Sequence, residues 1–283
     1  MACQLLGKSR QSFYKRKDVA KTKRLKAHVA VSLVREKRAV LPRLGTLKLY
    51  HVLYPELSQI KVGRDTLNRI LKVNGMLVKP LRQYRKTTCS THFLKKHKDL
   101  VTGKDITRPE QVWVSDITYI NNRTRHYFLS LVTDAYSKKI MGYNVDLNLT
   151  AELAMESLRI AIRSRNYKLK LVHHSDRGVQ YCSHEYQQIL QKFGIRTSMT
   201  ECYDPYTNAI AERVNGILKQ EFLLEGRDCS LAEMKVIVKQ SVEAYNNIRP
   251  HHSCYLLTPA KMHQQDSLKR KEYKSLKLPQ KVN

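Results

Sequence analysis

The sequence has 283 residues, of which 42% are hydrophobic, and it carries 52 Lys and Arg against 24 Asp and Glu, a formal net charge of +28. This length predicts two or three domains with at least one sizeable core, and the ordinary apolar content excludes a wholly disordered chain. Because it has no long apolar run and no signal-peptide start, we expect a cytoplasmic protein, and the positive surface favours nucleic acid over an anionic membrane as its partner.

Residues 1–80 are expected to form a basic helical region. A short helix around Leu5 would end at Gly7, and Ser9 would cap a second helix over SRQSFYKRK. A basic helix is expected next, from about Asp18 to Val40. Its expected apolar stripe consists of Val19, Leu25, Val29 and Leu33.

A second pair of helices is expected between Gly45 and Gly75. The run GTLKLYHVLY would be stopped by Pro55, and GRDTLNRILKVNG would form the next helix with Gly75 as its C-cap. Such pairs are typical of helix–turn–helix units that enter a DNA groove, although any small helical bundle has the same spacing. Residues 1–110 contain 27 Lys and Arg against 7 Asp and Glu, which favours DNA. The expected contacts here are Arg64 and Arg69.

The remainder of the chain predicts an α/β domain over residues 109–265, between a basic linker at 81–108 and a basic tail at 266–283. The runs QVWVSDITYI, HYFLSLVTDA and KIMGYNVD indicate an antiparallel meander. Helices and strands are then expected to alternate: the helix AELAMESLRIAIRS after the cap Thr150, the strand LKLVHHSD, the helix SHEYQQILQKFG, the strand IRTSMT and the helix NAIAERVNGILKQEF. A last helix is expected from the cap Ser230 to Pro250. This order predicts a mixed sheet with helices on its faces.

Three acidic residues occupy positions where an α/β fold collects active-site groups. Asp116 lies inside the first strand run, Asp176 ends a later strand, and Glu212 lies within a helix. A carboxylate among apolar residues is costly unless it is paired or binds a metal. Carboxylates are also the ligands that Mg²⁺ prefers, and two divalent ions suit phosphodiester chemistry. Asp116, Asp176 and Glu212 could thus bind two Mg²⁺, with Mn²⁺ as a substitute, although Asp116 also fits a turn or ion-pair carboxylate and Glu212 a solvated helix charge. We expect the three to be catalytic because of the sequence around them.

The sequence around these residues resembles a known family. The runs are WVSDITY at 113–119, HSDRGVQY at 174–181 and NAIAERVNGILK at 208–219, with 59 residues between Asp116 and Asp176 and 35 between Asp176 and Glu212. They resemble bacterial insertion-sequence transposases with a retroviral-integrase-type (DDE) catalytic core, and the chain looks like the product of the second of two overlapping reading frames. The resemblance covers most of the chain, including YNNIRPH at 245–251.

The resemblance implies a ribonuclease-H-like fold that brings the two Asp strands together and sets the Glu helix alongside them. It also implies cleavage at the 3′ ends of the element and strand transfer into target DNA by a homo-multimer. The chain is expected to open partway into its first helix–turn–helix. For this reason an upstream-frame segment, as a partner or a fusion, is expected to help it find DNA.

Residues near the three carboxylates are further candidates. Glu212, Asn215 and Lys219 share one helix face, so Lys219 is expected to hold a phosphate, although a solvated lysine is the alternative. The expected DNA contacts in this region are Lys219, Asn215, Arg177 and Arg213, and the possible site-lining residues are His174, Gln180, Tyr181 and Asn208. A structural role competes for three of these, because Arg177 with Gly178 suits a tight turn, His174 a satisfied strand histidine and Asn208 a helix N-cap.

Two other functions stay open from the sequence. A ribonuclease-H-like nuclease without strand transfer would have the same fold and metal site. A DNA-binding regulator with a vestigial core would need a lost carboxylate, and none of the three is lost. The basic helical front and the Asn-Ala-x-x-Glu context favour transposition.

Overall fold

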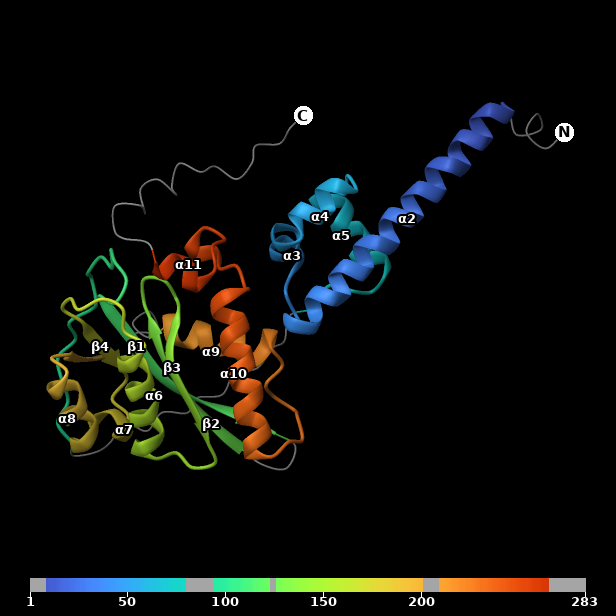
Figure 1. Ribbon diagram of the computed structural model, residues 1–283. Helices are drawn as coiled ribbons and strands as arrows, with labels where there is room; N and C mark the ends of the chain where they lie inside the picture. The colour runs from blue at the N-terminus through green and yellow to red at the C-terminus, as the bar shows by residue number, and fades with distance from the viewer. Residues whose placement is uncertain (1–8, 80–93, 123–125, 201–208, 265–283) are drawn as a thin grey trace. The chain divides into compact units, whose positions relative to one another are not determined.

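The computed structural model describes residues 9–79, 94–122, 126–200 and 209–264 (Figure 1). The chain divides into two compact units, residues 1–80 and 81–283. In the described ranges, every helix is too short or too polar to cross a membrane.

The first unit is entirely helical in its described part. Its helices are α2 (Arg10–Val40), α3 (Thr46–Val52), α4 (Tyr54–Gln59) and α5 (Arg64–Val73). The C-terminal part of α2 packs against α5, and Arg38 joins the pieces by donating to the carbonyls of Met76 (2.7 Å) and Leu44 (3.3 Å). The small core consists mainly of fully buried leucines, namely Leu41, Leu44, Leu49, Leu53, Leu57, Leu67 and Leu71.

The expected break before Asp18 is wrong, because α2 is one continuous helix of 31 residues. Neither Gly nor Pro occurs from residue 10 to residue 40, so nothing in the chain ends the helix there. The expected apolar stripe is also wrong at its start, since Val19 and Leu25 are exposed, and the buried residues of α2 are Ala30, Val31 and Val34. The short helix expected around Leu5 lies outside the described residues.

Pro55 does not simply stop the second pair of helices. Helix α3 ends at Val52, and Pro55 lies in the first turn of α4. Helix α4 was not predicted. Proline fits there because the first turn of a helix leaves its N–H groups unpaired. Gly75 follows α5 with a positive φ of 65°, and the N–H of Met76 donates to the carbonyl of Leu71 (2.8 Å), as expected for a glycine-terminated helix.

The second unit contains one sheet with the strand order β3-β2-β1-β4-β5. Its strands are β1 (Val112–Asn121), β2 (His126–Asp134), β3 (Ile140–Asp146), β4 (Val172–Ser175) and β5 (Arg196–Met199). The first three form an antiparallel meander, whereas β4 and β5 run parallel to β1. The predicted mixed sheet is therefore confirmed, and β1 lies at its centre.

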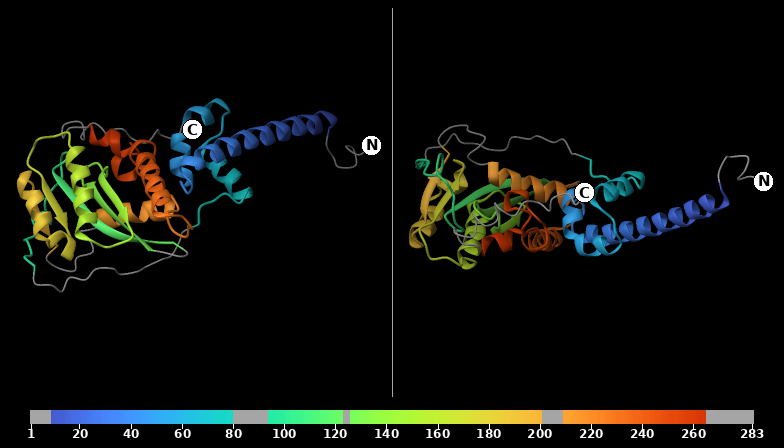
Figure 2. Two further views of the ribbon diagram at one scale, coloured as in Figure 1. Left: turned by 60° about the horizontal axis from the view of Figure 1, so that its bottom comes forward. Right: turned by 90° about the horizontal axis from the view of Figure 1, so that it is seen from above.

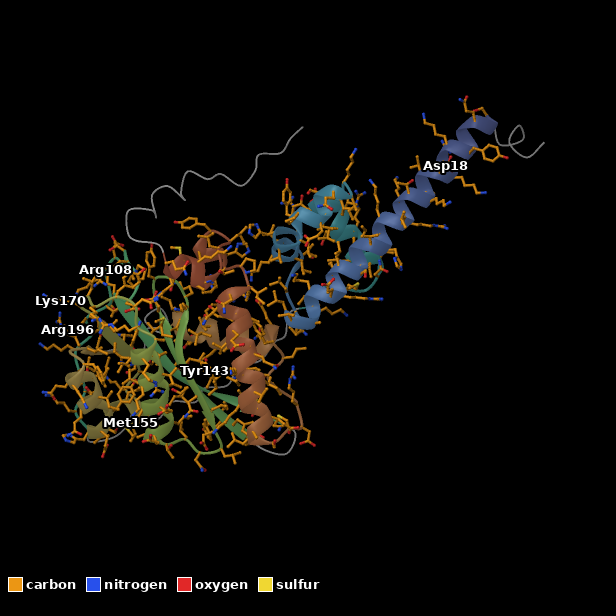
Figure 3. All side chains as sticks on the ribbon, viewed as in Figure 1. Asp18, Arg108, Tyr143, Met155, Lys170 and Arg196 are labelled. Atoms are coloured by element: carbon orange, nitrogen blue, oxygen red, sulfur yellow. The ribbon has the colours of Figure 1, made fainter. Side chains whose placement is uncertain are left out.

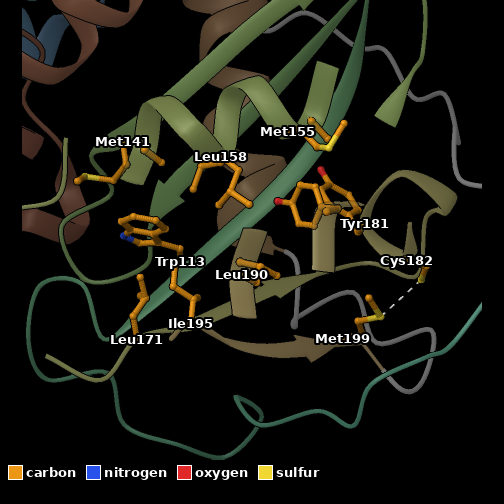
Figure 4. Packing of buried hydrophobic residues seen from close by; sticks show 14 residues of the cluster. Trp113, Met141, Met155, Leu158, Leu171, Tyr181, Cys182, Leu190, Ile195 and Met199 are labelled. Atoms are coloured by element: carbon orange, nitrogen blue, oxygen red, sulfur yellow. Dashed lines mark hydrogen bonds between the residues drawn. The ribbon is translucent and has the colours of Figure 1, made fainter. Parts of the chain in front are cut away.

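Helices cover both faces of this sheet (Figure 2). One face carries α6 (Ala151–Arg163), α7 (Val179–Cys182) and α8 (His184–Lys192), and their side chains enclose the main core around the fully buried Trp113 (Figure 4). The other face carries α9 (Ala209–Glu221), whose Ala211 packs against Val112 and Val114. The expected cap Thr150 is present, since its side chain accepts from a backbone N–H of α6, and Ser183 caps α8 in the same way. Helix α7 was not predicted.

Helix α10 (Leu231–Asn247) runs along the outer strand β3 and begins with a full capping box made by Ser230 and Glu233. Asn246 pairs with both backbone groups of Ile140, accepting from its N–H (3.0 Å) and donating to its carbonyl (2.9 Å). At the end of α10, the buried Arg249 forms a two-pronged ion pair with Glu221, at 2.8 and 2.7 Å. Arg249 thus ties α10 to the last residue of α9.

The segments before β1 and after α10 add further structure to this unit. Beyond Pro250 the chain forms a short 3₁₀ turn, η1 (His252–Cys254), and α11 (Pro259–His263), which were not predicted. Part of the expected linker packs on the sheet, since the N–H of Leu100 donates to Ser198 Oγ (2.8 Å) and Val101 joins the apolar cluster under α9.

Candidate active site

Asp116 lies on the central strand β1, on the face that α9 covers. Side chains alternate along a strand, so Asp116 continues the row of Val112 and Val114, which pack against Ala211 of α9. Its side chain is half-buried, and its Oδ2 accepts a hydrogen bond of 2.7 Å from Nδ2 of Asn215. The carboxylate of Asp116 is thereby held in place, half-buried, next to the apolar residues of this face.

Asp176 directly follows β4, the parallel neighbour of β1. The register pairs Ser115 with Ser175, so the residues that follow in the two strands, Asp116 and Asp176, come side by side. The N–H of Gly178 donates to Oδ1 of Asp176 (3.0 Å) and fixes the carboxylate in a tight turn. A Cβ on Gly178 would lie 3.0 Å from that same Oδ1 and 3.2 Å from Oε1 of Gln180, so a larger residue there would displace these side chains by a few tenths of an ångström.

Glu212 lies on the exposed side of α9, near the start of the helix. The helix is fixed against β1 by the buried residues Ala211, Val214 and Leu218 and by two polar contacts. One is the bond from Asn215 to Asp116, and the other runs from Lys219 Nζ to Thr118 Oγ1 (3.2 Å). Residues spaced four apart on α9 therefore meet residues spaced two apart on β1.

The charges of Asp176 and Glu212 both act on the carboxyl of Asp116. Burial and the charge of Asp176 raise the pKa of Asp116 to about 7, the charge of Glu212 adds to this, and the hydrogen bond from Asn215 opposes it. The charges of Asp116 and Asp176 also raise the pKa of the buried Tyr181, after the larger effects of burial and of Tyr186. The acidic residues singled out in the sequence thus form one cluster of excess negative charge.

A divalent cation fits this cluster in charge and in donor type. Within the described residues, no three acidic, His or Cys side chains are gathered closely enough to hold a metal ion as they stand. The fit rests instead on the parallel strands β1 and β4, which bring Asp116 and Asp176 side by side, and on the charge of Asp176, which together with burial raises the pKa of Asp116. A cation bound by carboxylate oxygens would remove this repulsion, as Mg²⁺ does with few protein ligands.

The predicted DNA contacts are placed differently from one another. Asn215 is buried and donates to Asp116, so its amide nitrogen is engaged inside the protein. Lys219 is half-buried and forms an ion pair with Glu225 (3.3 Å). Arg177 is half-buried in the turn after Asp176, and Arg213 is exposed on α9. In the helical unit, Arg64 and Arg69 are exposed on α5, with Arg64 paired to Asp65 (3.1 Å).

The residues proposed to line the site also differ. His174 is fully buried, and its two ring nitrogens contact Ser198 Oγ (2.9 Å) and Thr200 Oγ1 (3.3 Å), which is the arrangement of a satisfied strand histidine. Tyr181 is buried in the core below the carboxylates, and Gln180 is half-buried beside Gly178. Asn208 lies outside the described residues.

Two further residues at this site, Thr118 and Glu225, were missed in the sequence. Thr118 follows Asp116 by two positions, so strand alternation could have placed it on the same face. Glu225 lies beyond the end of α9, in a loop whose path no local pattern predicts. Both contact Lys219 and hold its ammonium group close to β1.

Known proteins resemble this chain along most of its length. An integrase core domain model matches residues 106–205, and a second one matches residues 193–259. A Shigella sonnei protein, the insertion element IS600 uncharacterized 31 kDa protein, is 33% identical over 264 residues, 89% of this chain and 93% of that one. Transposase InsF for insertion sequence IS3fB of Escherichia coli (strain K12) is 30% identical over 206 residues, 71% of this chain and 70% of that one. The chain belongs to the insertion-sequence transposases with an integrase-type core.

This transposase is thus an enzyme of the DDE type, and the integrase-core family is metal-dependent. Transposases of this family act on DNA. Among solved structures, the HTLV-2 integrase catalytic core domain in complex with magnesium aligns with 56% of this chain and 98% of its own, at 20% identity and a TM-score of 0.44.

Proposed function

We propose that this transposase cuts DNA at the ends of its insertion sequence and joins the freed 3′ ends to target DNA, with Asp116, Asp176 and Glu212 as the catalytic residues. The observation that carries the assignment of residues is the register of β1 and β4, which brings Asp116 and Asp176 side by side, together with the charge of Glu212 on α9, which acts on the carboxyl of Asp116. They would hold two Mg²⁺, or Mn²⁺ in its place. When bound, the two ions would lower the pKa of the attacking hydroxyl and stabilise the leaving oxygen.

The neighbouring side chains supply position and charge in this proposal. Asn215 orients the carboxylate of Asp116 through its Nδ2. The N–H of Gly178 orients Asp176. Lys219, held by Thr118, binds a DNA phosphate next to the carboxylates. Arg177 and Arg213 add positive charge along the same DNA strand.

The other parts of the chain are assigned by their charge. Residues 1–80 bind DNA, with Arg64 and Arg69 on the exposed side of α5. Residues 81–108 link this region to the catalytic core at 109–265. Residues 266–283 form a basic tail. The enzyme works as a homo-multimer in the bacterial cytoplasm, at the nucleoid. An upstream-frame segment would assist its recognition of the element ends.

The test is to incubate the purified chain with Mg²⁺ or Mn²⁺ and DNA that carries candidate element ends. We expect specific 3′-hydroxyl products and joined strands, both abolished by Glu212→Gln. The matched control is Glu185→Gln, which removes an exposed carboxylate from α8 on the other face of the sheet. Cutting without joining would indicate a nuclease, and metal-independent or random nicking that Glu212→Gln leaves unchanged would overturn the proposal.

A further inference from the structure

The first half of α2 is a bare, strongly basic helix. From residue 14 to residue 25 every side chain is exposed, and this stretch contains six Lys and Arg and one acidic residue, Asp18. Figure 3 shows Asp18 on this half of the helix, with side chains standing out on all sides. A helix that is polar all round needs another source of stability, and like charges one turn apart, such as Lys17 and Lys21, oppose its formation.

The basic residues are arranged in rows rather than scattered. Residues seven positions apart lie on nearly the same side of a helix, two turns apart. Three such rows lie next to one another on α2: Arg16 and Lys23, then Ala20 and Ala27, then Lys17 and Arg24. A central row of small residues is therefore flanked on both sides by a row of cations.

Within the described residues none of the four cations Arg16, Lys17, Lys23 and Arg24 has an ion pair with an acidic side chain. Farther along α2, the same side of the helix carries the buried Val31 and Val34, which pack toward α5. The packed face of the helix thus continues past the other helices as an uncovered face with alanines at its centre.

We propose that this face, made by Arg16, Lys17, Ala20, Lys23, Arg24 and Ala27 and called the basic face below, lies in the major groove of duplex DNA. The inference rests on the proposed function and names the segment and the groove through which the enzyme holds its substrate. The major groove, about 12 Å wide, admits an α-helix of about 10–12 Å diameter. Cations on both flanks reach the phosphates of both strands, and alanines at the centre let the helix approach the base edges.

Other partners fit this face less well. A second copy of the chain would bring like charges together along the whole face. On the opposite side of the helix, Asp18 and Thr22 interrupt Tyr14 and Leu25, so no continuous apolar stripe is available to enter a membrane. Duplex RNA has a deep and narrow major groove that a helix cannot enter.

The test measures DNA binding by the full chain in EDTA, so that cleavage does not interfere. The probes are a duplex with a candidate element end and a shuffled duplex of the same length. Arg16→Gln/Lys23→Gln and Lys17→Gln/Arg24→Gln should each reduce the salt dependence of log K by about 2, because each lost phosphate contact contributes about 0.9. The matched control, Lys15→Gln/Lys26→Gln, removes as many charges from the far side of the same helix and should leave this slope unchanged.

A second pair of variants tests the centre of the face. Ala20→Glu should lower affinity at least tenfold, whereas Thr22→Glu introduces the same charge on the opposite side and should lower it less than threefold. Methylation of guanine N7, which lies in the major groove, should interfere with binding of the parent chain and not of Ala20→Glu. Because residues 20 and 22 are exposed, Ala20→Glu and Thr22→Glu should both retain the parent melting temperature.

The proposal would be overturned if the test and control variants lost equal amounts of DNA affinity, or if N7 methylation did not affect binding of the parent chain. If the parent chain bound duplex RNA as tightly as duplex DNA, the face would be an RNA-binding face instead. Cleavage and joining are scored separately. If the basic-face variants bind, cut and join as the parent chain does, this inference fails while the proposed function stands. If the parent chain binds DNA through this face but forms no 3′-hydroxyl products with Mg²⁺, the proposed function fails instead.

Discussion

Asn215 on α9 donates a hydrogen bond to Asp116 on β1, 2.7 Å from Nδ2 to Oδ2, and so joins the helix of one candidate metal ligand to the strand of another. The same bond opposes the rise in the pKa of Asp116 that burial and the neighbouring carboxylates cause. Position and protonation of this carboxylate are therefore controlled by one side chain.

Asn215→Ala should shift the pH dependence of DNA cleavage. Without the hydrogen bond the pKa of Asp116 rises further above 7, so the carboxylate is protonated up to a higher pH and the acid limb of the cleavage profile moves to higher pH. Asn215→Gln retains the amide on a longer side chain, so its cleavage profile should be shifted less than that of Asn215→Ala. A variant that lowers the rate equally at every pH would show that Asn215 does not act through the protonation of Asp116.

Asp116→Asn should stabilise the metal-free enzyme at pH 8. The pKa of Asp116 is about 7 in the folded chain against an ordinary value of 3.8, so the folded state holds this proton more tightly, and stability decreases as the pH rises from about 4 to about 7. Removing the ionisable group should add about 2 kcal/mol to the free energy of unfolding at pH 8, and nothing below pH 4. Urea titrations at the two pH values measure the difference, and equal effects at both would contradict the prediction.

Mg²⁺ should raise the melting temperature of the parent chain and not that of Asp116→Asn. Binding to the folded state alone stabilises it, and the ion requires ionised carboxylates. The midpoint of the Mg²⁺ titration should consequently fall to lower concentration as the pH rises through 7. Glu185→Gln serves as the control, and it should respond to Mg²⁺ as the parent does.

Gly178→Ala should impair cleavage with little loss of stability. The added Cβ would lie 3.0 Å from Oδ1 of Asp176, so the carboxylate has to move away from the backbone N–H that orients it. A loss of ten- to a hundredfold in rate is expected, as for changes in residues that orient metal ligands. Gly45→Ala is the control, because a Cβ there meets no atom within 4 Å.

Breaking the ion pair between Arg249 and Glu221 should unfold the catalytic unit more easily. Arg249 is 1% exposed and its guanidinium also lies 5.6 Å from the ring centroid of Tyr245, so Arg249→Met removes a buried cation that pairs with Glu221 at the end of α9. A loss of about 3 kcal/mol is expected. The double variant Arg249→Met/Glu221→Leu should recover most of it, and strictly additive effects in this double-mutant cycle would contradict a direct pair.

Much of the catalytic unit could be predicted from the sequence because its signals are local. β-Branched and aromatic residues marked β1, and a capping residue preceded each of α6, α8 and α10. The carboxylates stood at strand and helix positions that the sheet then brings together. The helical unit was less predictable. Leu25 and Val19 have the spacing of a buried stripe, yet they are exposed because no described helix lies against that part of α2.

Contacts between distant residues were also beyond the sequence. Asn215 was expected to face DNA, and instead its amide nitrogen is used on Asp116, 99 positions away in the chain. Glu225 reaches Lys219 only because of the loop that follows α9. Such pairs depend on how helices settle on the sheet, which periodicity along a single element does not encode.

The pairing of Asn246 with Ile140 affects how copies of this enzyme can associate. An outer strand with free backbone groups invites strands of other molecules and leads to aggregation. Here a side-chain amide imitates the backbone of a neighbouring strand and occupies both groups of Ile140. At this position the sheet cannot be extended, so a crowded assembly on DNA can bring many copies together without their sheets fusing there.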